Sequence, residues 1–365
     1  MTARKSRYRQ MISWRSRTAF ERIRSGIARR LGLDINLLNS AVSIDQLHPA
    51  ETVAGPPCIA LPGQYERVLA VPFGNDLVSE IAEVQGAPRN IGPTLRYVIE
   101  NVIVSGGILY ARGRRKPFNC ELDYHYTELH WAEYDEVALR SSLIGCHFFG
   151  DWLRDDCTTH LLVEHLGKPM SMPTPLWPHQ GGYLALFQQA YDEVGRGHIR
   201  RLVVFDDIYQ NAHKAERIRR LRTHVATNRI PIAADRIIYL DRGSGGKQRT
   251  LLNQEEVIET LARRGVAIVQ PEALSVPQLI AELFGARIII GIEGSQLCHG
   301  VFTLRDAGGL LVIQPPNRFF NPHMDWARSL NMRYGIVVGE LRESAFYLPV
   351  DDLLRTIDLM DAKLP

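Results

Sequence analysis

The sequence predicts an α/β protein built from two doubly wound halves with a cleft between them. Short apolar runs alternate with helical stretches from about residue 141 onward. Strands and helices that alternate in this way usually form parallel sheets with helices on both faces. A chain of 365 residues is also longer than a single hydrophobic core normally supports. We therefore expect two domains.

The N-terminal segment, residues 1–45, is strongly basic. Its first 30 residues contain ten Lys or Arg and a single acid, whereas the rest of the chain carries more acidic than basic residues. A partly amphipathic helix is indicated by the spacing of Trp14, Phe20, Ile23 and Ile27. Two interpretations remain open, contact with an anionic membrane face or a solvated tail. Nucleic-acid binding is disfavoured because basic residues do not continue through the body of the chain.

Residues 46–212 are expected to form the first α/β domain. This domain begins with irregular β structure and continues with alternating helices and strands. The sequence predicts an extended piece at Lys168–Pro173, strands at Arg67–Val71, Asn101–Val104 and Arg201–Phe205, and helices at Trp152–Leu166 and Gly182–Val194.

Residues 213–345 are expected to form the second α/β domain, and residues 346–365 a C-terminal helix. Gly265 is a typical helix stop, and Ser275 followed by Pro277 is a typical helix start. Helices are predicted at His213–Asn228, at Asn253–Arg264 and after Ser275, and strands at Arg236–Leu240, Val266–Val269, Ile288–Ile290 and Leu310–Ile313.

Several common enzyme classes are excluded by missing motifs. Gly246-Lys247 is followed by Gln248 rather than Ser or Thr, so there is no phosphate-binding P-loop. The chain also lacks G-x-G-x-x-G after a strand, H-E-x-x-H, G-x-S-x-G and any Asp-x-Asp metal clamp. The five cysteines are scattered without a Cys-x-x-Cys pair, which fits reduced thiols and gives no metal knuckle. We therefore expect neither a bound metal nor a cofactor.

One strand-to-turn segment has the form of a phosphate cradle. A buried strand ends at Gly291, and Glu293-Gly294-Ser295-Gln296 then leads into a helix-like run. A tight turn of this kind can present backbone N–H groups and the positive end of a helix to a phosphate. An ordinary strand-to-helix turn is the alternative.

Two further segments bring polar side chains to strand ends. The loop after the strand at residues 236–240 carries the cations Arg242, Lys247 and Arg249, which can meet a phosphate, although a solvated turn is the simpler interpretation of this loop alone. Glu272 can accept hydrogen bonds from both hydroxyl groups of a ribose. The remaining candidates stand at helix starts, where capping is the alternative role, and they are Asn253, Ser275 and Gln278.

Together these motifs resemble the catalytic domain of glycosyltransferase family 61. The segment His147–Asp156 is also similar, more weakly, to an aromatic-Gly-His-Trp-Leu segment of that family. The chain departs from the family at Asp151, Glu293 and His299, where many members have His, His and Asn. The positions that match in order and spacing are Arg242, Arg249, Asn253, Pro271, Glu272, Ser275, Gln278 and Gly291–Leu297.

The resemblance implies inverting, metal-independent transfer of a sugar from a nucleotide-sugar donor to a glycan or polysaccharide acceptor. It also implies two Rossmann-like domains that face each other across a cleft, the GT-B arrangement, with the sugar donor on the second domain and the acceptor on the first. Inversion requires a base for the acceptor hydroxyl. Asp151 is the first candidate, with His147 and Asp155 behind it. Charge on a helix surface is the alternative for Asp155 and Asp156, and a packed imidazole is the alternative for His147.

The context implied by the resemblance is bacterial envelope polysaccharide synthesis, such as capsule formation. We expect a cytoplasmic protein, with peripheral contact to the inner membrane through the basic N-terminus as one interpretation. The chain has no run of about 18 apolar residues, and we expect no secretory signal because its N-terminus lacks an apolar stretch with a small-residue cleavage site. The competing functions are a catalytically silent scaffold that binds sugar nucleotides and a nucleotide-sugar epimerase.

Overall fold

The computed structural model describes residues 2–118, 131–227, 235–243 and 249–365. The chain divides into two compact units, and each unit draws on separate parts of the sequence. Residues 50–92 and 178–188, which come from the N-terminal half, pack with the C-terminal half. The first unit contains Met1–Pro49, Pro93–Trp177 and Gln189–Ile208, and the second contains Ala50–Gly92, Pro178–Gln188 and Tyr209–Pro365.

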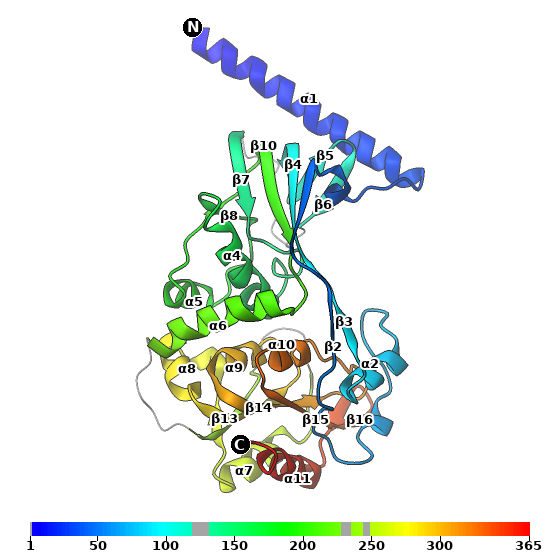
Figure 1. Cartoon of the computed structure of the whole chain (residues 1–365), viewed down its shortest axis with the longest axis vertical. Helices are drawn as coiled ribbons and strands as arrows, with labels where there is room; N and C mark the ends of the chain where they lie inside the picture. Colours follow the sequence, from blue (N-terminus) through cyan, green and yellow to red (C-terminus); the bar gives the residue numbers. More distant parts are fainter. Residues whose placement is uncertain (1, 119–130, 228–234, 244–248) are drawn as a thin grey trace. The chain divides into compact units, whose positions relative to one another are not determined.

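An eight-stranded mixed sheet forms the centre of the first unit (Figure 1). Its order is β6-β5-β4-β10-β7-β8-β9, and β1 pairs with β4 beside this path. The central strand β10 is antiparallel to β4 and parallel to β7. The strands are β1 (Ser43–His48), β4 (Thr94–Ser105), β5 (Ile108–Ala111), β6 (Arg114–Pro117), β7 (Ala132–Leu139), β8 (Pro169–Ser171), β9 (Asp192–Glu193) and β10 (Gly197–Asp206).

The helices of the first unit lie at its N-terminus and after β7. Helix α1 spans Thr2–Arg30, and a short 3-10 turn follows at Leu37–Ser40. After β7 the chain forms α3 (Phe149–Asp151), a π-helical turn (Trp152–Asp156) and α4 (Cys157–Val163). A π-helical turn inside a helix is rare and frequently marks a functional site.

A five-stranded parallel sheet forms the centre of the second unit. Its order is β12-β11-β13-β14-β15, and each neighbouring pair is parallel. In chain order this is a 2-1-3-4-5 arrangement, one of the two common doubly wound sheets. The strands are β11 (Ile237–Leu240), β12 (Ala267–Val269), β13 (Ala286–Ile292), β14 (Leu304–Gln314) and β15 (Arg333–Val338).

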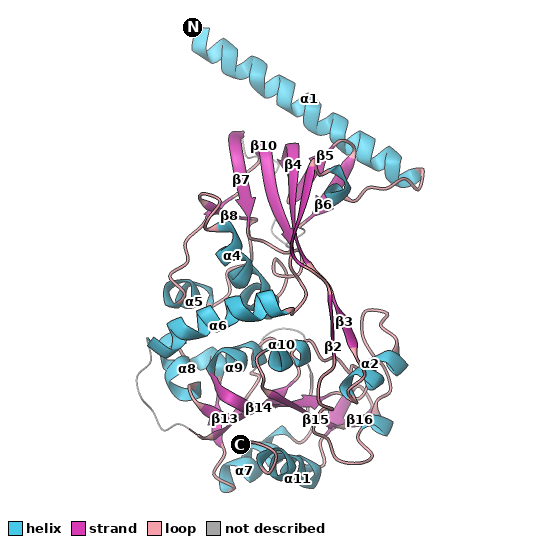
Figure 2. Ribbon diagram, in the orientation of Figure 1, coloured by secondary structure: helices cyan, strands magenta, loops and turns pink. Residues whose placement is uncertain are grey.

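Helices cover both faces of this parallel sheet (Figure 2). Helices α7 and α11 lie on one face and α8, α9 and α10 on the other. The helices of the unit are α2 (Leu77–Val84), α5 (Gln180–Leu186), α6 (Ala212–Thr227), α7 (Gln254–Arg263), α8 (Val276–Leu283), α9 (Leu297–Thr303), α10 (Met324–Ser329) and α11 (Val350–Asp361). Two small antiparallel pairs join β2 (Glu51–Val53) to β3 (Arg89–Ile91) and β16 (Glu340–Arg342) to β17 (Ala345–Tyr347).

The parallel strands are apolar on both faces because both faces are covered. Ile288, Ile289 and Ile290 are successive residues of β13, and none of them is exposed. A strand with only one buried face would instead alternate apolar and polar residues. This pattern explains why the strands of the second unit could be predicted from short apolar runs.

The α/β class is confirmed, and the second unit contains the doubly wound sheet that the sequence predicts. The sheet of the first unit is mixed, so a second Rossmann-like domain is not confirmed. The predicted strand at Arg67–Val71 is wrong, because the chain makes a 3-10 turn at Tyr65–Arg67 and residues 68–71 form no strand. The predicted helix at Gly182–Val194 ends near Leu186, because Gln188 takes a left-handed φ of 55° and the chain then enters β9.

Candidate functional site

Polar side chains gather at the carboxyl ends of the parallel strands in the second unit. Arg242 follows β11, Glu293 follows β13, and Arg318 follows β14. These three strands are neighbours in the sheet. In a 2-1-3-4-5 sheet the second strand is added on one side of the first strand and the third on the other side. The order of strands therefore reverses between the first and third strands, here β11 and β13. Ligands of doubly wound folds bind outside the carboxyl ends of the strands at this switch point.

Glu293 is the centre of an arginine cluster, which consists of Arg242, Arg249 and Arg318. Arg249 Nε donates a hydrogen bond of 2.5 Å to Glu293 Oε2, and both side chains are almost fully buried. Arg318 Nε lies 3.6 Å from the same oxygen. Arg242 Nη1 donates to the backbone carbonyl of Glu293 at 2.7 Å. Two guanidinium groups therefore lie at the Glu293 carboxylate and a third at its backbone carbonyl, and the cluster keeps an excess of positive charge.

Arg242 is held close to the turn that follows β13. Burial lowers the pKa of its guanidinium, and the neighbouring charge of Arg249 lowers it further. Gly294 lets the Arg242 guanidinium approach the turn this closely, because a Cβ at position 294 would displace it. Nη1 also lies 3.4 Å from Gln296 Oε1. The turn and the arginine thus depend on each other for their placement.

Asp241 anchors the start of the same loop. Its carboxylate is 4% exposed and accepts hydrogen bonds from Gln254 Nε2 at 2.8 Å and Gln270 Nε2 at 3.0 Å. These two glutamines tie the end of β11 to the start of α7 and the end of β12. The sequence did not predict the role of these two glutamines, because a side-chain amide that binds a carboxylate is not part of a recognisable sequence motif.

Glu272 lies close to the arginine-bearing loop. Gly243 has a φ of 64°, and a Cβ there would stand 2.6 Å from Glu272 Oε2. The Glu272 charge also acts on Arg242. The structure therefore brings Glu272 together with Arg242, as the sequence predicts for neighbouring strand ends.

The backbone of the turn after Gly294 is less open to a ligand than its sequence indicates. The N–H groups of Leu297, Cys298 and His299 donate to the carbonyls of Gly294, Ser295 and Gln296 respectively. Helix α9 also has only seven residues, so its dipole is small. The arginine side chains are therefore the main source of positive charge at this site.

Three predicted residues lie at helix starts. The capping alternative for Asn253 is wrong, because its side chain makes no capping hydrogen bond to α7. Asn253 exchanges hydrogen bonds with the backbone of Leu348, at 2.9 and 3.0 Å, and so fastens α7 to the chain after β17. Ser275 and Gln278 form a capping box at α8, with Ser275 Oγ donating to Gln278 Oε1 at 2.6 Å. The capping role expected for Ser275 is confirmed. Lys247 lies outside the described residues.

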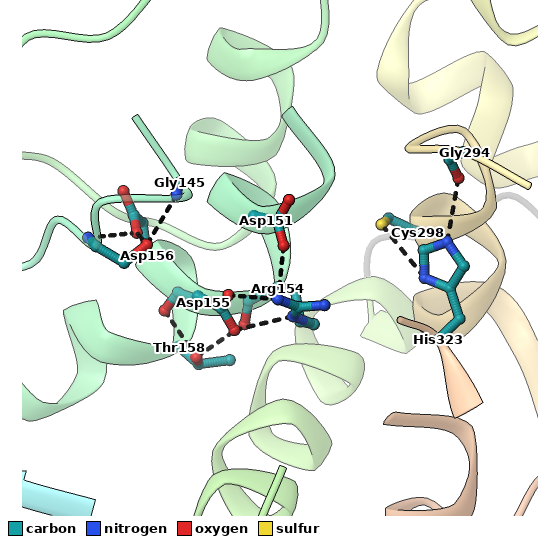
Figure 3. A network of polar contacts seen from close by, with 10 residues as sticks. Gly145, Asp151, Arg154, Asp155, Asp156, Thr158, Gly294, Cys298 and His323 are labelled. Carbon is teal, nitrogen blue, oxygen red and sulfur yellow. Dashed lines mark hydrogen bonds and ion pairs between the residues drawn. The ribbon is translucent and has the colours of Figure 1, made fainter. Parts of the chain in front are cut away.

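His323 contacts the backbone of the turn that follows β13, and no sequence motif predicted this role. Its Nε2 lies 3.1 Å from the carbonyl oxygen of Gly294, and its Nδ1 lies 3.9 Å from Cys298 Sγ (Figure 3). A carbonyl can only accept, so Nε2 carries the proton. The buried imidazole thus fixes the backbone of Gly294 beside Arg242.

Helix α5 brings two further polar side chains to α9. Tyr183 Oη lies 2.7 Å from His299 Nδ1, and the His179 ring meets the His299 ring edge-on at 5.0 Å. Burial and, to a lesser extent, the nearby His179 lower the pKa of His299 to about 3. His299 is therefore neutral at physiological pH.

In the first unit the predicted carboxylates lie around the π-helical turn. Arg154 Nη2 donates to Asp151 Oδ1 at 2.6 Å and to Asp155 Oδ2 at 2.7 Å (Figure 3). The Asp151 side chain remains 22% exposed, whereas Asp155 is almost fully buried. His147 is half-buried against Phe148. Of the three candidates, Asp151 is the carboxylate that reaches the surface of the unit.

Asp156 is buried beside a buried arginine. Ser142 donates to Asp156 Oδ1 from both its backbone N–H and its hydroxyl at 2.8 Å, and burial raises the pKa of Asp156 to about 7. Arg140 is not exposed and stacks 4.6 Å from the Tyr191 ring. The alternative of surface charge for Asp155 and Asp156 is therefore wrong, because both carboxylates fix the turn from inside.

Part of the chain matches a known protein family. Residues 146–310 match the family model described as Glycosyltransferase 61. This range begins next to His147 and includes the carboxyl ends of β11 and β13. No curated protein matches the chain. The match supports the family assignment suggested by the sequence motifs.

Proposed function

We propose that this chain, which its family 61 match identifies as a glycosyltransferase, moves a sugar from a nucleotide-sugar donor to a glycan or polysaccharide acceptor with inversion and without a metal. The observation that carries the proposal is the arginine cluster around Glu293 at the switch point of the parallel sheet. A nucleoside diphosphate is an anion of the size and charge that such a cluster can receive.

The arginine cluster supports metal-independent chemistry. When the sugar leaves, negative charge builds up on the diphosphate, and catalysis requires positive groups already in place. Arg242 and Arg249 can supply this charge, with Lys247 as a third candidate on the same loop. A divalent cation would be repelled by the excess positive charge of the cluster. Removal of one such group typically raises the barrier by ~3 kcal/mol.

On the acceptor side we propose Asp151 as the base. In a single displacement the acceptor oxygen attacks the anomeric carbon, its proton passes to a carboxylate, and the nucleoside diphosphate departs. Asp151 is partly exposed, and Arg154 fixes its orientation. Asp155 holds Arg154 from the buried side, which makes it a positioning residue, and His147 is the second candidate for the base.

Peripheral membrane contact through α1 also remains a proposal. The described part of α1 exposes Phe20, Ile23 and Ile27 at helical spacing, next to arginines. None of the helices among the described residues has the length and apolar character needed to cross a membrane. A surface helix of this kind can still bind anionic lipid through its apolar face and its charge.

Thermal unfolding with nucleotides tests the proposed sugar-donor site. UDP, GDP, CDP and CMP are each added with EDTA and with magnesium. At a hundred times its dissociation constant, a ligand adds ~2.7 kcal/mol to the free energy of unfolding. We expect one nucleotide to stabilise the protein equally with and without the metal.

Two variants make the nucleotide test specific. Arg242→Ala removes a guanidinium that contacts a carbonyl and Gln296, without leaving Glu293 unpaired, and it should abolish the shift. Arg342→Ala is the matched control, since Arg342 is an exposed arginine of the same unit that stacks on Tyr347. No shift with any nucleotide, or an equal shift in Arg242→Ala, would contradict the proposed site.

A further inference from the structure

An upstream segment of the chain forms part of the rim of the arginine cluster. The N–H groups of Leu69 and Ala70 both donate to the carbonyl of Pro316, at 2.7 and 3.3 Å, and Phe319 N–H donates to Ala70 at 2.9 Å. Residues after β14 therefore pair with residues near 70. All of them belong to the second unit.

This pairing places Arg318 between two aromatic rings. The guanidinium carbon lies 5.2 Å from the centroid of Phe73 and 5.6 Å from that of Phe320. The two rings meet edge-on, with centroids 5.3 Å apart. A guanidinium held over two ring faces gains cation–π attraction and loses side-chain freedom. The position of Arg318 is thus fixed before any ligand binds.

Phe73 has two properties that a purely structural residue would rarely combine. Its side chain is 66% exposed although it is large and apolar. Its backbone has a φ of 63°, a left-handed conformation that is a genuine outlier for a bulky residue. Backbone strain of this kind is unfavourable and clusters at ligand-binding sites. The fold therefore keeps the Phe73 ring exposed although the backbone at this residue is strained.

Arg318 connects this aromatic pair to the arginine cluster. Its Nε lies 3.6 Å from Glu293 Oε2, the oxygen that also accepts from Arg249. If the phosphates of a nucleoside diphosphate bind at the arginine cluster, its nucleoside can extend toward the two rings. Nucleobases stack on aromatic side chains whatever their sequence, since each base has a π face.

We propose that Phe73, Arg318 and Phe320 form the wall that recognises the nucleoside of the sugar donor, an inference that rests on the sugar-donor site proposed above. Arg318 is the third phosphate-binding guanidinium, and the exposed Phe73 ring stacks on the base. All three residues lie outside the family match at 146–310. The choice of nucleotide is therefore set by parts of the chain that the family match does not cover.

Calorimetric titration in EDTA tests the wall, with inorganic pyrophosphate and the stabilising nucleoside diphosphate as the two ligands. Pyrophosphate has the phosphates but no base. Phe73→Leu should weaken nucleoside diphosphate binding about tenfold and leave pyrophosphate binding unchanged, while Phe73→Tyr should retain both. Arg318→Ala should weaken both ligands at least tenfold, because each loses a charge-assisted hydrogen bond.

Matched controls and thermal unfolding keep these results interpretable. Phe20→Leu replaces another exposed phenylalanine, and Arg342→Ala another arginine stacked on an aromatic ring. Wild-type affinity for the nucleotide in Phe73→Leu would overturn the stacking role. An equal loss of both ligands in Phe73→Leu would also overturn it, because the ring would then act only through Arg318. A wild-type protein that binds neither ligand would overturn the sugar-donor site itself, and the wall with it.

Discussion

Glu293 is the residue at the centre of the arginine cluster, and its surroundings explain why a carboxylate suits this position. The carboxylate is buried and faces Arg249 and Arg318, while Arg242 binds its carbonyl. A histidine at this position would add a further hydrogen-bond donor to three cations. The carboxylate instead fixes two guanidinium groups and leaves the cluster positive enough for a diphosphate.

Glu293→Ala should lower the free energy of unfolding by about 3–5 kcal/mol, because it leaves the buried Arg249 guanidinium without its ion-pair partner. Urea unfolding measures the loss. Glu259→Ala, an exposed glutamate in the middle of α7, is the control and should stay within about 0.5 kcal/mol of the wild type. Equal effects of the two substitutions would show that the Glu293 pairs do not stabilise the site.

His299 should make the stability sensitive to acid. Its pKa is about 3 in the folded protein against an ordinary 6.5 in the unfolded chain. Between these values the unfolded state binds more protons, so the free energy of unfolding falls as the pH falls from 6.5 toward 3. The slope for one such group is about 1.4 kcal/mol per pH unit, and it vanishes above about pH 7.

Urea unfolding at pH 7, 6 and 5 checks this dependence by comparing the wild type with His299→Gln. Taking the difference between the two proteins cancels the other titrating groups, such as Asp156, whose raised pKa gives a slope of opposite sign. The His299→Gln variant should lose part of the acid sensitivity. Identical slopes would mean that His299 is not held neutral by burial.

At the scale of elements, the packing of α5 on α8 can be tested with two adjacent glycines. A Cβ at Gly182 would stand 2.6 Å from Val276 Cγ2, whereas a Cβ at Gly181 would meet no heavy atom within 4 Å. Gly182→Ala should therefore destabilise by roughly 1–3 kcal/mol through overpacking. Gly181→Ala should be neutral or stabilise by up to about 1 kcal/mol, because alanine favours the helix. Thermal unfolding distinguishes them, and similar stabilisation by both would contradict the contact.

The elements that sequence predicted well are those whose pattern is local. The buried strands β11, β12, β13 and β14 each contain a short apolar run, and the start of α8 carries its own capping box. Failures arose where distant contacts decide the conformation. The N–H groups of Leu69 and Ala70 donate to the carbonyl of Pro316 in the loop after β14, so these residues do not join a sheet. Gln188 has a left-handed φ, and this conformation ends α5.

The residues of the candidate site also fall into those that the sequence predicts and those that it does not. Arg242, Glu272 and Glu293 could be predicted together because each follows a parallel strand, and strand ends meet at one edge of the sheet. Phe73, Arg318 and His323 could not, because no motif connects residues so far apart in the chain. Their role depends on the pairing of two loops and on a single backbone carbonyl.

For the whole molecule, the basic N-terminal helix gives a test of membrane contact. Phe20, Ile23 and Ile27 are 58%, 61% and 53% exposed. If α1 binds lipid, the wild type should sediment with vesicles rich in phosphatidylserine and much less with neutral ones. The triple serine variant of these residues should remain in solution, since about 0.8 kcal/mol is lost per CH₂ withdrawn from the bilayer. Equal sedimentation of both proteins would favour the solvated helix.

The central proposal has two parts. Arginines take the place of a metal in the sugar-donor site, and the sugar is transferred with inversion. The most direct test of this proposal is proton NMR of sugar-nucleotide turnover in EDTA, with the sugar donor chosen from the stabilising nucleotide and methanol as acceptor. We predict that the first product has the inverted anomeric configuration and that Arg242→Ala slows turnover about a hundredfold. A product of retained configuration, turnover only with magnesium, or an unaffected rate in Arg242→Ala would contradict this account.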